Sequence, residues 1–170
     1  MSLFNNFADR MIATAHTRAP DETIGGERDP YLCRWHLART EHYNIYLHRF
    51  QRSDDDRALL DHPWHSLSFT LRGNYYELRD KPSPTSPLKL RRAGSLVFRS
   101  ARTRHRIILP VTRIHTGTSK QRLVPIPCYT LFITGPRIRE WGFYCPQGFV
   151  HWRDFTAGEH GEIVGKGCGE

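Results

Sequence analysis

Two histidines flank a proline in the segment Asp61-His62-Pro63-Trp64-His65. Proline lacks the N–H group that a central strand needs, so this segment is expected to turn at a strand end. Neutral imidazole is a common ligand for divalent transition metals, and two or three of them can leave a coordination position open for a substrate. The segment therefore indicates a site for metal or acid–base chemistry.

A third and a fourth histidine belong to the same hypothesis. His105 follows the segment Gly94-Ser95-Leu96-Val97-Phe98-Arg99, and a second hairpin would return it to the first two. His48, on the preceding predicted strand, is a further contributor or lies on the pocket wall. The candidate metal ligands are therefore His62, His65, His105 and His48.

Other side chains near these histidines are candidates for binding a substrate. Arg99 and Arg104 flank the segment before His105, and an arginine that points inward can hold a carboxylate or phosphate through a two-pronged contact. Strand alternation leaves open which of the two does so. Tyr46 and Tyr75 are candidates for hydrogen bonding at the pocket mouth, with packing as the alternative. Glu77, on the next predicted strand, could also reach the pocket, and the alternative is that it lies on the exposed face of that strand.

The elements that must position these residues are one helix and many short strands. Apolar residues recur at spacings of three and four over residues 3–16, which predicts a helix that packs against the outside or bottom of a sheet. Alternating patterns predict strands at 31–38, 44–51, 65–72, 75–79, 88–91, 95–99, 105–109, 128–134, 141–144 and 149–152. Residues 81–87 are expected to form a loop, and residues 110–127 a longer, irregular connection.

The chain of 170 residues fits one domain. Many short strands with regular turn signals predict an all-β sandwich or barrel, and closure into a barrel removes the unpaired edges. We divide the chain into an N-terminal helix and loop at 1–30, a barrel at 31–155, and a flexible, glycine-rich tail at 156–170.

The spacing of two segments resembles the two motifs of the cupin superfamily, G-x5-H-x-H-x3-4-E-x6-G and G-x5-P-x-G-x2-H-x3-N. Alignment on Gly73 places His62 at the second histidine of the first motif, with Leu60 at the first histidine and Ser66 at the glutamate. In the second motif, alignment on Gly94 brings His105 to the histidine, while the proline, the second glycine and the asparagine are replaced. Those replacements are Ser100, Arg102 and Leu109. The similarity covers about residues 44–134.

Segments around Trp35, His48, Trp64, Arg92 and Gly142 are similar to those of small bacterial and phage cupin-like proteins. The resemblance implies a cupin-type double-stranded β-helix, or jelly-roll barrel, with one N-terminal α-helix. It also implies a metal-binding enzyme, oxygenase- or isomerase-like, that holds Fe, Mn, Ni or Zn and acts on a small anionic molecule. Many cupins pair as homodimers, so the same resemblance suggests that this chain forms a homodimer.

Two alternatives stay open. Because Leu60 and Ser66 replace usual ligands, the barrel is alternatively metal-free, as a binding module or as an epimerase-like enzyme with a histidine as general base. A net charge of +8 suggests nucleic-acid binding as a second alternative. Against it, the arginines form no continuous block and no nucleic-acid-binding motif is recognised.

The four cysteines form no C-x-x-C pair. The chain shows no secretory h-region at its N-terminus and no apolar run long enough to span a membrane. These features predict a cytoplasmic protein with reduced thiols and no membrane contact.

Overall fold

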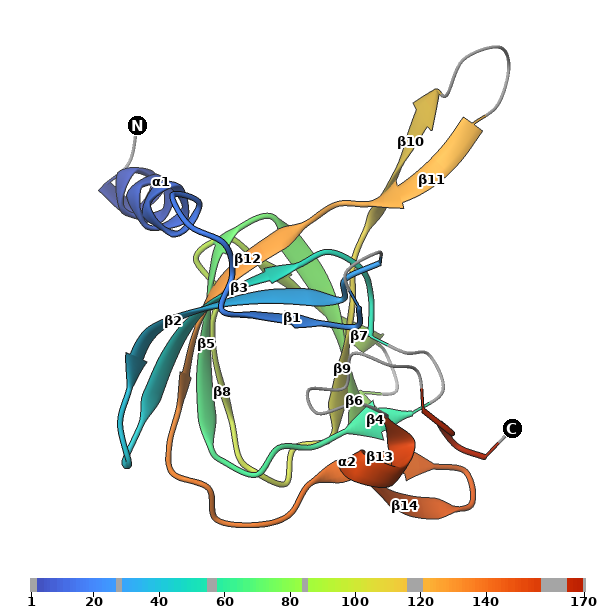
Figure 1. Cartoon of the computed structure of the whole chain (residues 1–170). Coiled ribbons are helices and arrows are strands. Elements are labelled where there is room, and N and C mark those ends of the chain that lie inside the picture. The colour runs from blue at the N-terminus through green and yellow to red at the C-terminus, as the bar shows by residue number, and fades with distance from the viewer. Residues whose placement is uncertain are drawn as a thin grey trace.

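Two antiparallel six-stranded sheets face each other and enclose a barrel (Figure 1). A two-stranded hairpin projects from this barrel, and a helix lies against its outside. The computed structural model describes residues 3–26, 29–54, 58–83, 86–115, 121–156 and 165–169, without the side chains of 81–83 and 86–87.

The first sheet carries most of the strands that were expected from alternation. Its strand order is β1-β2-β3-β12-β5-β8, and every neighbouring pair is antiparallel. The strands are β1 (Glu22–Ile24), β2 (Leu32–Arg39), β3 (Asn44–Phe50), β12 (Cys128–Thr134), β5 (Ser66–Arg72) and β8 (Leu96–Arg99). Because β12 lies between β3 and β5, residues far apart in the sequence share one face.

The second sheet closes the other side of the barrel with the order β14-β13-β4-β9-β6-β7. Its strands are β14 (Gly148–His151), β13 (Gly142–Cys145), β4 (Leu59–Leu60), β9 (His105–Ile108), β6 (Asn74–Ser83) and β7 (Ser86–Arg92). Leu60 of β4 pairs in register with His105 of β9. This pairing fixes where the two motif segments meet.

The N-terminal helix α1 (Leu3–Ala15) packs on the outside of the first sheet, as its apolar spacing predicts. Ala8 and Ile12 join a buried cluster with Leu47 and Leu71. The alternation of β5 explains this arrangement, because Phe69 packs against this cluster while Ser66 and other hydroxyl residues are buried on the opposite face. The polar face of the strand is therefore the one inside the barrel.

Several elements differ from the sequence-based expectations. Residues 110–127, expected to be irregular, contain the hairpin of β10 (Val111–His115) and β11 (Gln121–Pro125) that projects in Figure 1. The loop expected at 81–87 is largely strand, since β6 continues to Ser83 and β7 begins at Ser86. A short helix, α2 (Trp152–Phe155), replaces the end of the last predicted strand. Local periodicity does not reveal these elements, because the segments are short and weakly patterned and their strands form through pairing with other parts of the sheet.

The described C-terminal residues are joined to β13 by a disulfide between Cys145 and Cys168. The expectation of four reduced thiols is therefore wrong for this pair, whereas Cys33 and Cys128 are free and buried. Most of the tail predicted to be flexible, residues 157–164 and the last residue, lies outside the described residues. Within the described chain, neither helix is long and apolar enough to cross a bilayer.

Candidate functional site

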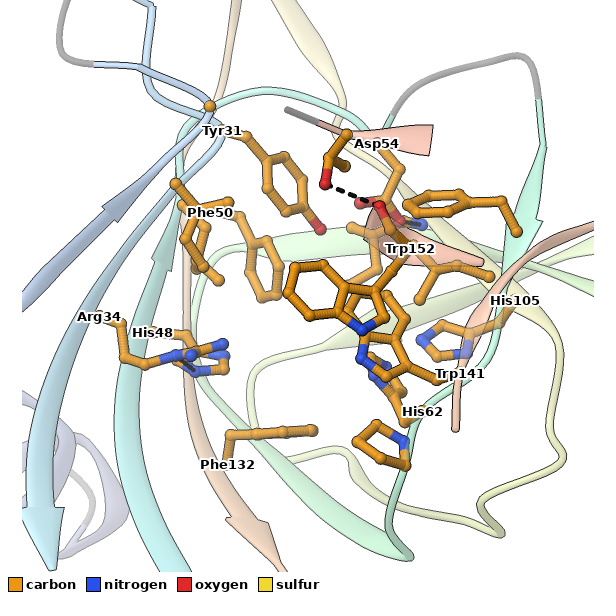
Figure 2. A pocket seen from close by; sticks show the side chains of 18 of the residues that line it. Tyr31, Arg34, His48, Phe50, Asp54, His62, His105, Phe132, Trp141 and Trp152 are labelled. Carbon is orange, nitrogen blue, oxygen red and sulfur yellow. Dashed lines mark hydrogen bonds between the residues drawn. The ribbon is translucent and has the colours of Figure 1, made fainter. Parts of the chain in front are cut away.

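A cavity of about 430 Å³ lies inside the barrel between the two sheets. Arg34 of β2, His48 of β3 and Phe132 of β12 line it from the first sheet, while His105 of β9 and Trp152 of α2 line it from the other side (Figure 2). Its size suits a small organic molecule, since ligand pockets usually enclose about 300–1,000 Å³. The cavity is therefore the candidate functional site.

His62 and His105 meet at this cavity, as the spacing of the motifs predicts. Leu60 pairs with His105 across β4 and β9, so the chain beyond β4 brings His62 beside the same strand end. The two ring centroids are 5.1 Å apart. His105 Nδ1 lies 3.3 Å from the carbonyl oxygen of Thr103, and an N–H at that atom leaves the lone pair of the other ring nitrogen free.

Both imidazoles are neutral at physiological pH. Burial and the nearby charge of Arg99 lower the pKa of His62 to about 3, against a small opposing effect of Asp61. The same two causes, in the same order, hold the pKa of His105 well below its ordinary value. A neutral imidazole can accept a proton or bind a metal, so the arrangement is compatible with both chemistries.

His48 also faces the cavity, but its ring is engaged differently. Arg34 Nε donates to His48 Nε2 at 3.0 Å, and Arg34 Nη1 donates to Glu22 at 2.7 Å. Burial and the charge of Arg34 hold the pKa of His48 well below its ordinary value. The neutral ring therefore carries its proton on Nδ1 and has no free lone pair, so in this arrangement it can donate a hydrogen bond but cannot bind a metal.

Arg99 lines the cavity, and its buried charge is held by the neighbouring strand. Its Nε donates to Glu77 at 2.7 Å and its Nη2 donates to the hydroxyl of Tyr75 at 2.9 Å. Glu77 also accepts from Arg91 at 2.7 Å and from Arg79 at 3.3 Å. One carboxylate thus faces three guanidinium groups, and the cluster carries excess positive charge beside the two histidines.

The remaining sequence candidates lie outside the cavity lining. His65 is exposed on the outer face, where its ring stacks on Phe98, so the structure does not bring it to His62. Arg104 lies over the ring of Tyr144 and pairs with Asp80 at the surface. Tyr46, Tyr75 and Glu77 are buried next to lining residues rather than on the lining itself.

Sequence reasoning missed most of the cavity wall. The rings of Trp141 and Trp152 stack at 5.7 Å, and Trp141 lies 6.1 Å from His62. The buried indole N–H groups of Trp64 and Trp152 have no hydrogen-bond acceptor among the described residues. Tryptophan is usually a core residue, so nothing in the local pattern marks these positions as lining a site.

A carboxyl group lies at the other end of the cavity. Asp54 accepts a hydrogen bond from the backbone N–H of Ile107 and lies near Tyr31 in Figure 2. Burial raises the pKa of Asp54 to about 6, although hydrogen bonds from Tyr31 and Ile107 oppose this. No motif in the sequence points to Asp54.

The donor set does not complete the metal site that the cupin resemblance implies. His62 and His105 supply two nitrogen ligands, whereas catalytic zinc sites, for example, usually take three protein ligands. Glu77 accepts hydrogen bonds from Arg91 and Arg99, and the lone pair on His48 Nε2 accepts one from Arg34, so neither side chain has a ligand atom to offer. Within the part of the chain that the structure describes, no group of three His, Cys, Asp or Glu side chains could hold a metal ion.

Solved structures share this fold. A DMSP lyase, DddQ, from Ruegeria pomeroyi is 15% identical with a TM-score of 0.56, and the match covers 87% of this chain and 72% of that one. A conserved protein with a double-stranded β-helix domain from Klebsiella pneumoniae has 12% identity, a TM-score of 0.47, and coverage of 72% and 91% respectively. An RmlC-like cupin family protein from Methanocaldococcus jannaschii has 11% identity, a TM-score of 0.44, and coverage of 69% and 92%.

No family model matches the sequence, and no curated protein matches it. The two facing antiparallel sheets form the double-stranded β-helix barrel that the sequence predicts, and the lyase with a TM-score of 0.56 shares this fold, which confirms the predicted fold class. At these identities the likeness extends to the fold alone.

Proposed function

We propose that this chain is a cupin-fold enzyme that binds a small organic acid in the barrel and moves a proton with His62 and His105. The observation that carries the proposal is the apposition of the two imidazoles, 5.1 Å apart, at the wall of a cavity that Arg99 also lines. A pair of neutral imidazoles beside a buried cation is suited to proton transfer on an anion.

The charge around the cavity supports the proposal of an anionic substrate. Among the residues that the structure describes, the cluster of Arg99, Arg91 and Arg79 has one carboxylate, Glu77, as its counter-ion. A carboxylate of the substrate near Arg99 would offset the remaining charge. The bound anion would also oppose the effect of Arg99 on His62, so the pKa of that imidazole would rise toward the range useful for a general base.

The proposed reaction is abstraction of a proton from the carbon next to a carbonyl or carboxylate group. One imidazole takes the proton, and the electron pair of the C–H bond moves onto the carbonyl oxygen, where the charge of Arg99 stabilises it. The imidazolium formed in this step can pass its proton to the second imidazole, whose ring centroid is 5.1 Å away, and that ring can return the proton to carbon. This is isomerase- or epimerase-like chemistry, and it needs no oxidant or reductant.

Proton exchange with solvent tests the proposal directly. The protein is incubated in D₂O with 2-oxo acids, 2-hydroxy acids and arylacetic acids, with EDTA present, and loss of the C–H signal is followed by proton NMR. We expect exchange with at least one class. His62→Ala and His105→Ala should each slow it by about 10²-fold or more, as removal of a general acid or base usually does.

His65→Ala is the matched control, because His65 comes from the same segment but is exposed on the outer face. Its exchange rate should equal that of the unmodified chain. Exchange that persists unchanged in His62→Ala would contradict the proposal, and so would the absence of exchange in every acid class.

Binding of Fe, Mn, Ni or Zn by His62 and His105 stays a prediction of the cupin resemblance. Elemental analysis after reconstitution with each metal, compared with His105→Ala, measures it. If exchange disappears in EDTA and returns with one of these metals, the metal-dependent interpretation replaces the metal-independent one.

A further inference from the structure

His48 is held in the cavity wall as a fixed hydrogen-bond donor. Its ring stacks with Tyr46, at 5.7 Å and 19°, and with Phe132, at 4.9 Å and 27°. Arg34 occupies its Nε2, and Glu22 in turn binds Arg34. The ring can therefore neither rotate freely nor use its lone pair, and Nδ1–H is left without an acceptor among the described residues.

The charges around His48 differ from those around Arg99. Arg34 is balanced by Glu22, which also contacts His36 Nε2 at 2.7 Å. This wall therefore offers N–H donors without excess positive charge, and it suits a neutral acceptor such as an ether, hydroxyl or carbonyl oxygen. The carboxylate of an acid is better placed at Arg99, where three guanidinium groups share one carboxylate.

Aromatic rings line the cavity between these two polar regions. Phe132 lies near both histidines, with ring centroids 4.9 Å from His48 and 6.2 Å from His62. Trp141 and Trp152 stack on the other side of the cavity (Figure 2). The buried N–H of Trp152 lacks an acceptor among the described residues, and such a group normally obtains one when a ligand binds. Flat rings favour a flat apolar ligand, since aromatic pairs gain about 0.5–1.5 kcal/mol beyond their burial.

From this arrangement, and on the basis of the proposed function, we infer that the substrate is an aromatic acid with an oxygen acceptor on its ring. Its carboxylate lies at Arg99, its reactive carbon lies at His62 and His105, and its ring lies among Phe132, Trp141 and Trp152. The ring oxygen accepts the hydrogen bond of His48.

Matched ligand pairs test each part of this inference by titration calorimetry. Phenylacetate and cyclohexylacetate differ in the flatness of the ring, and phenylacetate and phenylacetamide differ in charge. Methoxyphenylacetates and the corresponding ethylphenylacetates have nearly the same shape, and only the former carry an acceptor. We expect phenylacetate to bind at least threefold more tightly than cyclohexylacetate and the amide. In the 3- or 4-substituted series, the methoxy compound should bind about three- to tenfold more tightly than the ethyl compound, as for one added hydrogen bond.

The variants assign the acceptor preference to one side chain. His48→Phe removes the donor and should bring the methoxy and ethyl compounds to equal affinity, while the preference for the acid over the amide stays. His48→Gln keeps an N–H donor and should retain part of the methoxy preference. Circular dichroism melting curves verify that both variants fold, and only folded variants are compared.

Two results would overturn the inference. The first is equal or tighter binding of cyclohexylacetate, and the second is a methoxy preference that His48→Phe leaves unchanged. If aliphatic acids bind and exchange protons while aryl acids do not, this inference fails and the proposed function stands. If none of the acids binds, both fail.

Discussion

Arg99 donates a 2.7 Å hydrogen bond to Glu77 although both side chains are almost fully withdrawn from solvent, at 2% and 0% exposure. Burial alone would raise the pKa of Glu77, but Arg99 and Arg91 outweigh it and lower that pKa to about 2. Glu77 is therefore an ionised counter-ion at neutral pH. Through it, β6 holds Arg99 of β8 in place beside the cavity.

Glu77→Gln should strongly destabilise the protein. The substitution keeps the shape of the side chain but leaves the buried guanidinium of Arg99 without its counter-ion, and loss of one partner of a buried pair costs about 3–5 kcal/mol. Urea unfolding at pH 7 measures the change. Asp80→Asn is the control, because Asp80 pairs with Arg104 at the surface and such pairs contribute about 0–1 kcal/mol. Equal effects of the two substitutions would contradict the role given to Glu77.

Acidification should lower the free energy of unfolding between about pH 6.5 and pH 4. The pKa of His62 is lowered to about 3, and those of His48 and His105 lie well below 6.5, so in this window the unfolded chain takes up protons that the native protein does not. Each histidine contributes a slope of up to about 1.4 kcal/mol per pH unit, and its stabilisation is complete above pH 6.5.

Asp54 acts in the opposite direction over part of that window. Its pKa is raised from 3.8 to about 6, so the folded state binds a proton that the unfolded state lacks, and this contribution is lost as the pH rises toward 6. Three histidines outweigh one aspartate, and stability should still fall on acidification. Urea midpoints at pH 7, 6 and 5 measure this, and Asp54→Asn should steepen the dependence. A midpoint that does not change with pH would contradict the burial of neutral histidines.

The disulfide between Cys145 and Cys168 should be visible in a thiol count and in stability. The unreduced, denatured protein should show two reactive thiols, from Cys33 and Cys128, and the reduced protein should show four. The cross-link spans 23 positions in the sequence, so Cys168→Ser should lower stability by about 3 kcal/mol through the added freedom of the unfolded chain.

Cys33→Ser is the control for the stability effect of Cys168→Ser, because Cys33 is buried but forms no disulfide. The unreduced, denatured variant should show one reactive thiol, from Cys128, and the reduced variant should show three, so the difference of two that comes from the Cys145–Cys168 pair is unchanged. Four reactive thiols in the unreduced chain would contradict the cross-link and would agree with the reduced, cytoplasmic state that the cysteine pattern predicts.

The fold and the centre of the site were predictable because both depend on regular spacing. Alternation along residues 65–72 predicts a strand with one hydroxyl face, and motif spacing brings His62 to His105. The same alternation does not say which face is inside, and here the hydroxyl face is, because α1 covers the apolar one. Arg34 was not recognised because a charged residue on an alternating strand usually faces solvent. Its role depends on Glu22, which β1 brings beside β2.

The position of α1 has a consequence for how this protein can change. Ala8 and Ile12 help to bury the outer face of the first sheet, so the apolar cluster that they form with Leu47 and Leu71 is on the far side of the strands from the cavity. Replacement of a polar lining residue such as Ser68 leaves that cluster intact, whereas Phe50 and Ile107 line the cavity and also belong to a second buried cluster. New specificities can therefore arise in this scaffold by replacement of inward-facing residues, while the outward-facing layer preserves the architecture.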